Sequence, residues 1–166
     1  MATTDSEPEV TFRKVTKETV RRVCDLRVAP SQEGFVAPNA VSIAEAYFEP
    51  KAWFRAVYAG EEPVGFVMLY VDESVQALPA LDHLDKPLYY LWRFMIAAGH
   101  QGRGYGARSL RLVIRHVGEQ PGARSLYLSV VPGQGSAEAF YERFGFERTG
   151  HVHEGEVEMR LALDRG

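Results

Sequence analysis

The stretch from residue 88 to residue 117 constrains the fold more than any other part of this sequence. Leu88–Ile96 is a strongly apolar run, which predicts a buried strand. It is followed by a glycine-rich turn, Gln101–Gly106, and then by a predicted helix. That helix carries Leu110, Val113 and Val117 on one face, at the spacing of an amphipathic helix. A buried strand that leads into such a helix predicts layers of sheet and helix packed on one core.

Strand and helix patterns alternate along the rest of the chain. Strands are predicted at 10–15, 53–58, 63–71, 124–131, 146–152 and 157–163, and further helices at 16–28, 39–47 and 135–144. Thr16 and Asn39 are candidate N-caps of the first two helices. The resulting order, β-α-α-β-β-β-α-β-α-β-β, predicts a mixed three-layer α/β fold.

Length and composition indicate one globular domain and exclude several classes of protein. The 166 residues predict a single domain over 10–166 after a flexible, polar tail at 1–9. The 19 Lys and Arg residues nearly balance the 22 Asp and Glu residues, which argues against a dedicated nucleic-acid binder. No apolar run approaches the ~20 residues of a membrane span, and the first residues do not resemble a signal peptide. We therefore expect a cytoplasmic protein with no nucleic-acid or membrane partner.

Neither the cysteine nor the histidines predict a metal site. Cys24, the single cysteine, cannot form an internal disulfide or a cysteine cluster. It shares an apolar helix face with Val20 and Val23, which indicates a core thiol rather than a nucleophile. His151 and His153 would share one face of a strand, but a closed site needs three or four ligands. We expect a solvated strand end there and no metal.

The glycine-rich turn is the strongest chemical signal. Glycines at 102, 104 and 106 allow successive backbone N–H groups to turn toward one point. The following helix adds its unpaired first N–H groups and its positive dipole end, so the segment can form a nest for a diphosphate. A plain turn would use glycine as well. No Gly-Lys-Ser/Thr follows, so this is no P-loop, and the long preceding region excludes the dinucleotide fingerprint.

Charges are distributed in blocks along the chain. Residues 88–124 contain six arginines and one acid, whereas residues 59–87 contain six acids and one base. Residues 28–50 contain three acids and neither lysine nor arginine. Solvated faces account for any single charge, while the asymmetry of the blocks favours a phosphate-rich ligand beside a cationic one.

Two paired motifs resemble the GNAT family of N-acetyltransferases. They are the strand with its glycine-rich turn and the segment 137–146, Ala-Glu-Ala-Phe-Tyr-Glu-Arg-Phe-Gly-Phe, and the resemblance spans about residues 10–163. Segments 31–44 and 89–96 are similar to the bacterial spermine/spermidine (diamine) acetyltransferases. The resemblance implies a mostly antiparallel central sheet flanked by helices, acetyl-CoA as co-substrate, and a homodimer.

The same resemblance implies roles for individual residues. The backbone of Phe94, Met95 and Ile96 would contact the pantetheine arm and the acetyl carbonyl. The pyrophosphate would be held by Gln101, Gly102, Arg103, Gly104, Tyr105, Gly106 and Ala107. Gln134 stands where the family more often has an asparagine that faces the pantetheine. Tyr141 stands at the proton-donating tyrosine, although an aromatic residue on the core face of a helix would also fit this position.

Acetyl transfer to an amine fits these residue types. The reaction requires a neutral amine, a polarised carbonyl and a proton for the leaving thiolate. Backbone N–H groups can polarise the carbonyl, and a tyrosine hydroxyl can supply the proton. Some polyamine acetyltransferases have a glutamate where this chain has Trp92, so either another acid such as Glu33 acts through water or the neutral amine binds directly. Polyamines are cations, and carboxylates and aromatic rings should line their site. The candidates are Glu33, Glu45, Trp92 and Tyr89.

The sequence therefore predicts an acetyl-CoA-dependent N-acetyltransferase that acts on a polyamine such as spermine or spermidine. Another amine remains open as the acceptor, either an aminoglycoside-type antibiotic or a protein N-terminus. A non-catalytic module that binds acyl-CoA is the alternative from a different class.

Overall fold

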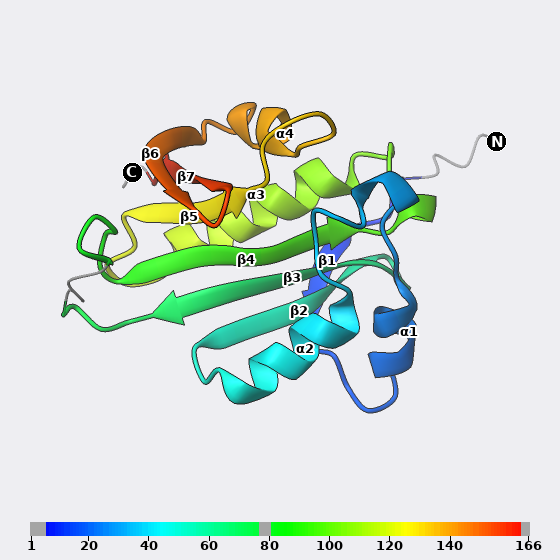
Figure 1. Cartoon of the computed structure of the whole chain (residues 1–166). Helices are drawn as coiled ribbons and strands as arrows, with labels where there is room; N and C mark the ends of the chain where they lie inside the picture. The colour runs from blue at the N-terminus through cyan, green and yellow to red at the C-terminus, as the bar shows by residue number, and fades with distance from the viewer. Residues whose placement is uncertain (1–5, 77–80, 164–166) are drawn as a thin grey trace.

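A computed structural model describes residues 6–76 and 81–163, and its elements follow the predicted order (Figure 1). The strands are β1 (Val10–Arg13), β2 (Ala52–Ala59), β3 (Glu62–Asp72), β4 (Leu88–Ile96), β5 (Ser125–Val130), β6 (Glu147–His153) and β7 (Glu156–Ala162). The α-helices are α1 (Val20–Asp25), α2 (Asn39–Phe48), α3 (Tyr105–Gly118) and α4 (Glu138–Glu142), with short 3-10 helices at Pro30–Gln32 and Ala98–His100.

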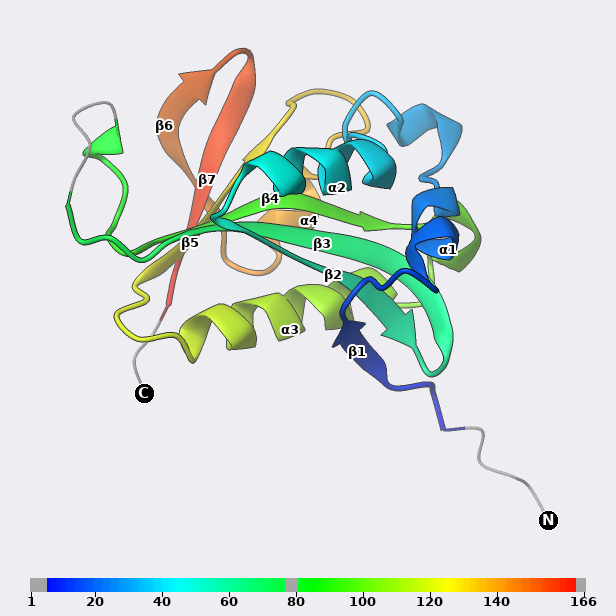
Figure 2. The same cartoon turned by 90° about the horizontal axis from the view of Figure 1, so that it is seen from below.

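The strands form one sheet between two helical layers. Their order is β1-β2-β3-β4-β5-β7-β6, and every neighbouring pair is antiparallel except β4 and β5. Figure 2 shows α3 on one face of the sheet and α1 with α2 on the other. Val57 and Leu126 pack with Leu110 of α3 in one core cluster, whereas Phe66 and Met68 pack with Val23 of α1 in a second cluster. The mixed, mostly antiparallel α/β fold is confirmed.

The first two helices begin differently from the prediction. The first helix starts at Val20 rather than beside Thr16, because residues 17–19 form a turn, and the Val20 N–H donates to the Thr16 carbonyl at 2.8 Å. Asn39 is not the N-cap of α2 but lies inside the helix, and Pro38 precedes it. Its buried amide donates to the Val23 carbonyl of α1 at 2.9 Å. Asn39 therefore ties the two helices together.

Part of the predicted N-terminal tail contacts the domain. The Pro8 carbonyl accepts a hydrogen bond from Arg108 at 3.0 Å, and the Glu9 carbonyl accepts one from the Gly60 N–H at 2.9 Å. Residues 1–5 of the predicted tail lie outside the described residues. The free thiol of Cys24 is half-buried on α1.

Within residues 6–76 and 81–163, no helix combines the length and the apolar character needed to cross a bilayer. The same ranges contain no group of three or more His, Cys, Asp or Glu side chains that could hold a metal ion.

The strands β4 and β5 separate after a short paired stretch, and this separation positions the site. Their paired residues are Tyr90 with Tyr127 and Leu91 with Leu128. The register between β3 and β4 shifts at the same place, where Trp92 is an extra residue on β4, as in a β-bulge. A bulge bends its strand and disrupts the local ladder. The second half of β4 consequently has an edge without a strand partner on the β5 side.

Candidate active site

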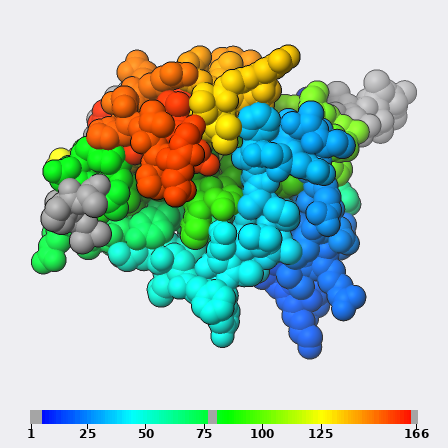
Figure 3. All heavy atoms as spheres, viewed as in Figure 1, coloured from blue at the N-terminus to red at the C-terminus, as the bar shows by residue number. Residues whose placement is uncertain are grey.

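A cavity of about 900 Å³ lies where β4 and β5 separate. Its walls come from β4, β5 and α4, from the turn before α3, from the start of β7, and from the segment between α1 and α2. Figure 3 shows the hollow between that segment and the β6–β7 hairpin, with β4 deep inside it. A cavity of this size is at the upper end of the range for small-molecule sites and can hold an extended ligand.

The glycine-rich turn forms one end of this cavity. Gly102 and Gly104 have φ values of +74° and +78°, a conformation that favours glycine. A Cβ atom at either position would meet nothing within 4 Å, so the turn is open on its ligand side. The N-terminus of α3, with first N–H groups that lack intrahelical acceptors, follows directly. These donors fit a diphosphate, as the sequence predicts.

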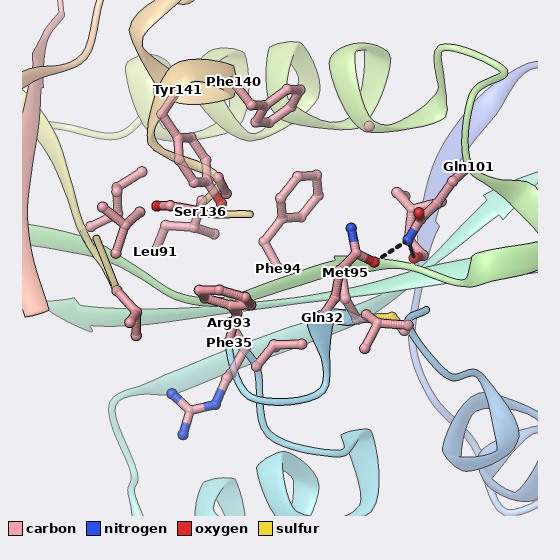
Figure 4. Close-up of a pocket in the computed structure, with 18 of the residues that line it drawn as sticks. Gln32, Phe35, Leu91, Arg93, Phe94, Met95, Gln101, Ser136, Phe140 and Tyr141 are labelled. Atoms are coloured by element: carbon pink, nitrogen blue, oxygen red, sulfur yellow. Dashed lines mark hydrogen bonds between the residues drawn. The ribbon is translucent and has the colours of Figure 1, made fainter. Parts of the chain in front are cut away.

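Most residues predicted to contact the diphosphate line the cavity. They are Gln101, Gly102, Gly104, Tyr105, Gly106 and Ala107. The side-chain amide of Gln101 donates to the Ile96 carbonyl at 2.9 Å and to Oε1 of Gln32 at 2.8 Å, so it joins β4 to the segment after α1 (Figure 4). Arg103 is exposed and does not line the cavity. Its possible contact with a phosphate finds no support in this geometry.

The second half of β4 forms the long wall of the cavity. Phe94, Met95 and Ile96 line it, as expected. Because β5 no longer pairs with this stretch, backbone groups on its free edge can bond an extended ligand that carries amides. The ring of Phe94 lies 6.4 Å from that of Phe140, centroid to centroid, and the two rings make this part of the wall apolar. Gln134, in contrast, is exposed and lies outside the lining.

Tyr141 extends from α4 into the cavity (Figure 4). Its side chain is 8% exposed, and its ring packs edge-to-face on Phe140 at 5.2 Å and on Phe146 at 5.6 Å. Burial raises the pKa of the Tyr141 hydroxyl above its ordinary value. The hydroxyl therefore keeps its proton at neutral pH and can donate it. The sequence allows Tyr141 to be either a core aromatic residue or the proton donor. In the structure its ring belongs to the core cluster and the residue also lines the cavity.

The four residues expected to bind the substrate do not lie together. Glu33, exposed after the first 3-10 helix, and Trp92, at the bulge of β4, both line the cavity. Glu45 does not line the cavity, and its carboxylate pairs with the guanidinium of Arg93 at 3.2 Å. The structure contradicts the expectation for Tyr89. That side chain is 2% exposed and belongs to the core cluster under α3, so a substrate in the cavity cannot reach it.

Arg93 links the cavity wall to α2. Its guanidinium donates to the Trp92 carbonyl at 3.0 Å and to Glu45, and it lies 5.4 Å from the centroid of the Trp92 ring. In Figure 4 the guanidinium points away from Tyr141 and toward α2. The charge of Glu45 is thus balanced within the protein.

Few charged residues of the sequence blocks line the cavity. Four of the six acids in 59–87 pair with cations elsewhere, in Glu61–Arg13, Glu62–Arg22, Asp72–Lys51 and Asp85–Arg160. In the described part of the chain, none of those six acids lines the cavity, and Arg93 is the one arginine of the basic block that does. The charges of the two blocks therefore contribute little to the cavity lining itself, and most of the acids in 59–87 are held in ion pairs within the fold.

Sequence reasoning missed several residues of the lining. They include Phe35, Arg93, Ser129, Ser136, Phe140, Arg143 and Glu156. Ser136 follows the predicted Gln134 by two residues, so the predicted loop reaches the cavity with a different side chain. No sequence pattern points to Glu156, because its strand reaches the cavity only through the pairing of β7 with β5.

Comparison with known proteins gives consistent matches. A family model for the acetyltransferase (GNAT) family matches residues 20–146. The spermine/spermidine N(1)-acetyltransferase of Bacillus subtilis strain 168 is 28% identical over 148 residues, which cover 86% of this chain and 91% of that protein. The structure of spermidine N-acetyltransferase from Vibrio cholerae in complex with CoA and spermine has a TM-score of 0.69 at 16% identity, covering 93% of this chain and 95% of that one. An aminoglycoside acetyltransferase in complex with coenzyme A has a TM-score of 0.72 at 18% identity, with the same coverage.

Proposed function

The chain belongs to the acetyltransferase (GNAT) family, and on this basis we propose that it transfers the acetyl group of acetyl-CoA to a primary amine of a polyamine such as spermine or spermidine. The observation that carries the proposal is one cavity with the glycine-rich turn at one end and Tyr141 in its wall. The turn offers donors for the diphosphate of a nucleotide ligand, and Tyr141 offers a proton for a leaving group.

The residues of the cavity have separate tasks in this reaction. Acetyl-CoA supplies a thioester whose carbonyl an amine can attack. The free backbone edge at Phe94–Ile96 would hold the arm of the ligand and stabilise negative charge that develops on the carbonyl oxygen. Tyr141, whose hydroxyl keeps its proton at neutral pH, would donate that proton to the departing sulfur. General acids of this kind typically accelerate a reaction about 10²- to 10⁴-fold.

A cationic acceptor is supported by the remaining lining. Glu33 forms no ion pair in the described ranges, and the Trp92 ring offers an aromatic face for an ammonium group. Glu45 would act indirectly, by holding Arg93 away from the reacting groups. The names of the Bacillus relative and of the Vibrio structure point to the same class of amine.

The release of CoA from acetyl-CoA tests this proposal directly. Spermine, spermidine, short diamines, an aminoglycoside and a basic peptide would be compared as acceptors at equal concentration. Selective turnover of the polyamines is the expected result. Turnover of the aminoglycoside or the peptide alone would replace the polyamine, and binding of acetyl-CoA without any turnover would favour a non-catalytic module.

We also infer a homodimer, on the family resemblance. Light scattering after size-exclusion chromatography should then give twice the chain mass of 18.6 kDa. A mass equal to that of one chain would contradict this inference.

A further inference from the structure

We propose that Glu156 is the carboxylate that binds the reacting amine and accepts the proton that this amine loses; the proposal rests on the acetyltransferase function above. Glu156 is the first residue of β7, has an exposed side chain and lines the cavity. Among the described lining residues, Glu33 is the other carboxylate.

Glu156 is available for a bound cation. Across residues 6–76 and 81–163 it takes part in no ion pair. Glu45, in contrast, is held by Arg93. The nearby carboxylate of Glu158 is held by His83 at 3.1 Å and by the Thr149 hydroxyl at 2.8 Å. An ammonium group in the cavity would give Glu156 a partner, whereas Glu45 and Glu158 have theirs within the protein.

The strand register places Glu156 opposite Tyr141 across the sheet. Val157 pairs with Val130 of β5, and both side chains belong to the core cluster that also contains Tyr141. Successive residues of a strand point to opposite faces, so Glu156 points to the other face, the one that α2 covers. Tyr141 therefore approaches the cavity from one face and Glu156 from the other. Glu156 can then accept a proton from the attacking amine while Tyr141 donates one to the departing sulfur.

The wall around Glu156 carries negative charge. Ser129 pairs with Glu158 in the register and lines the cavity, and its hydroxyl is hydrogen-bonded to the Tyr90 hydroxyl. Burial raises the pKa of Tyr90, the bond to Ser129 lowers it, and the charges of Glu158 and Glu156 raise it further. Tyr90 thus stays neutral, and the proton acceptor on this wall is a carboxylate.

Glu33 is less suited to the reacting nitrogen. Its neighbour Gln32 is hydrogen-bonded to Gln101 at 2.8 Å, at the start of the glycine-rich turn. The backbone at Glu33 therefore lies beside the diphosphate end of the cavity, and we assign Glu33 to a second ammonium group of the acceptor rather than to the reacting nitrogen.

Two protons leave the nitrogen during the reaction. The bound ammonium first gives one proton to Glu156, which releases it to solvent because its side chain is exposed. The nitrogen lone pair then forms the C–N bond, and the C–S bond breaks with its electron pair on sulfur. Tyr141 gives its proton to sulfur and regains one from the second N–H, through water. The products are the acetamide, the free thiol and one proton in solution.

The substitution Glu156→Gln tests the assignment, because it removes the charge and retains the shape. Calorimetry would measure spermidine binding to the CoA-saturated protein for the wild type, for this variant and for Glu147→Gln. Glu147 is an exposed glutamate of β6 that lies outside the cavity lining. We expect Glu156→Gln to weaken spermidine binding about 10- to 100-fold, as for a lost charged hydrogen bond, and to leave acetyl-CoA binding unchanged. Glu147→Gln should bind spermidine as the wild type does.

Kinetics and the control variant separate the possible failures. In steady state, Glu156→Gln should raise KM for spermidine and lower kcat, with KM for acetyl-CoA unchanged. Equal spermidine affinity in the wild type and Glu156→Gln would overturn the assignment alone, as would an equal loss in Glu147→Gln. Absence of spermidine binding to the wild type, together with no turnover of any amine, would overturn the proposed function and the assignment with it.

Discussion

Replacing Tyr141 by phenylalanine removes one oxygen atom from the cavity wall and leaves the packing in place. The ring contacts with Phe140 at 5.2 Å and Phe146 at 5.6 Å do not involve the hydroxyl, and within the described residues the hydroxyl forms no hydrogen bond that the change would break. We therefore expect the free energy of unfolding to change by less than about 1 kcal/mol. The loss of a general acid should lower kcat by about 10²- to 10⁴-fold, which corresponds to about 3–5 kcal/mol in the activation free energy.

The pKa of Tyr141 predicts how this deficit depends on pH. Burial raises that pKa above the ordinary value of about 10, so the hydroxyl stays protonated at every pH below it. The ratio of wild-type to variant kcat should therefore be constant between about pH 6 and pH 9. Only above the raised pKa would the wild type lose its proton donor.

The assay is the release of free CoA thiol, measured together with calorimetric binding of acetyl-CoA. Tyr58→Phe is the matched control, because Tyr58 is also a buried tyrosine but lies on β2 and outside the cavity lining. It should retain full turnover. Unchanged turnover in Tyr141→Phe would refute the assignment of the acid. A loss of acetyl-CoA affinity as large as the loss of kcat would show that the hydroxyl binds the ligand instead of donating a proton.

Three further predictions concern the turn, the strand contact and the response to acid. Gly104→Glu places a carboxylate at the N-terminus of α3, where it would repel the diphosphate, on a backbone with φ of +78° that favours glycine. Acetyl-CoA affinity measured by calorimetry should fall at least about 100-fold, and wild-type affinity would refute the diphosphate nest. Gly65→Ala would press a Cβ atom against the Met95 carbonyl oxygen, so thermal denaturation should show a loss of about 2–4 kcal/mol, and an unchanged Tm would contradict the tight approach of β3 and β4. Burial raises the pKa of Asp72, but hydrogen bonds, among them the one from Lys51, lower it from 3.8 to about 2. The ionised Asp72 therefore stabilises the fold above its unfolded pKa, and this stabilisation is lost as the pH falls from about 4 to 2. Urea titrations should show that the free energy of unfolding of Asp72→Asn falls by about 1–2 kcal/mol less than that of the wild type over this pH range, a value that allows for solvent screening. An identical acid response in both proteins would count against the ion pair.

The sequence by itself determined the features that depend on neighbouring residues. The bounds of the strand Leu88–Ile96 were predicted as the structure has them, because a continuous apolar run can be recognised without knowing its partners. The glycine-rich turn and the helix after it were also predicted, since the positive φ values at Gly102 and Gly104 and the helical spacing are local properties. These segments were enough to find the cavity wall, and the resemblance of segment 137–146 to the family selected Tyr141.

Only the tertiary structure decided which charges and aromatic rings face the cavity. The bulge at Trp92 shifts the alternation of side chains along β4, so the faces of its residues cannot be counted from one end of the strand, and Tyr89 lies in the core. The packing of α2 places Glu45 beside Arg93, and the ion pair between them balances the charge that the sequence offered for a substrate. No sequence pattern indicated Glu156, because its strand β7 reaches the cavity only by pairing with β5. Side-chain direction and ion pairing depend on contacts between residues far apart in the chain, and a linear pattern does not contain them.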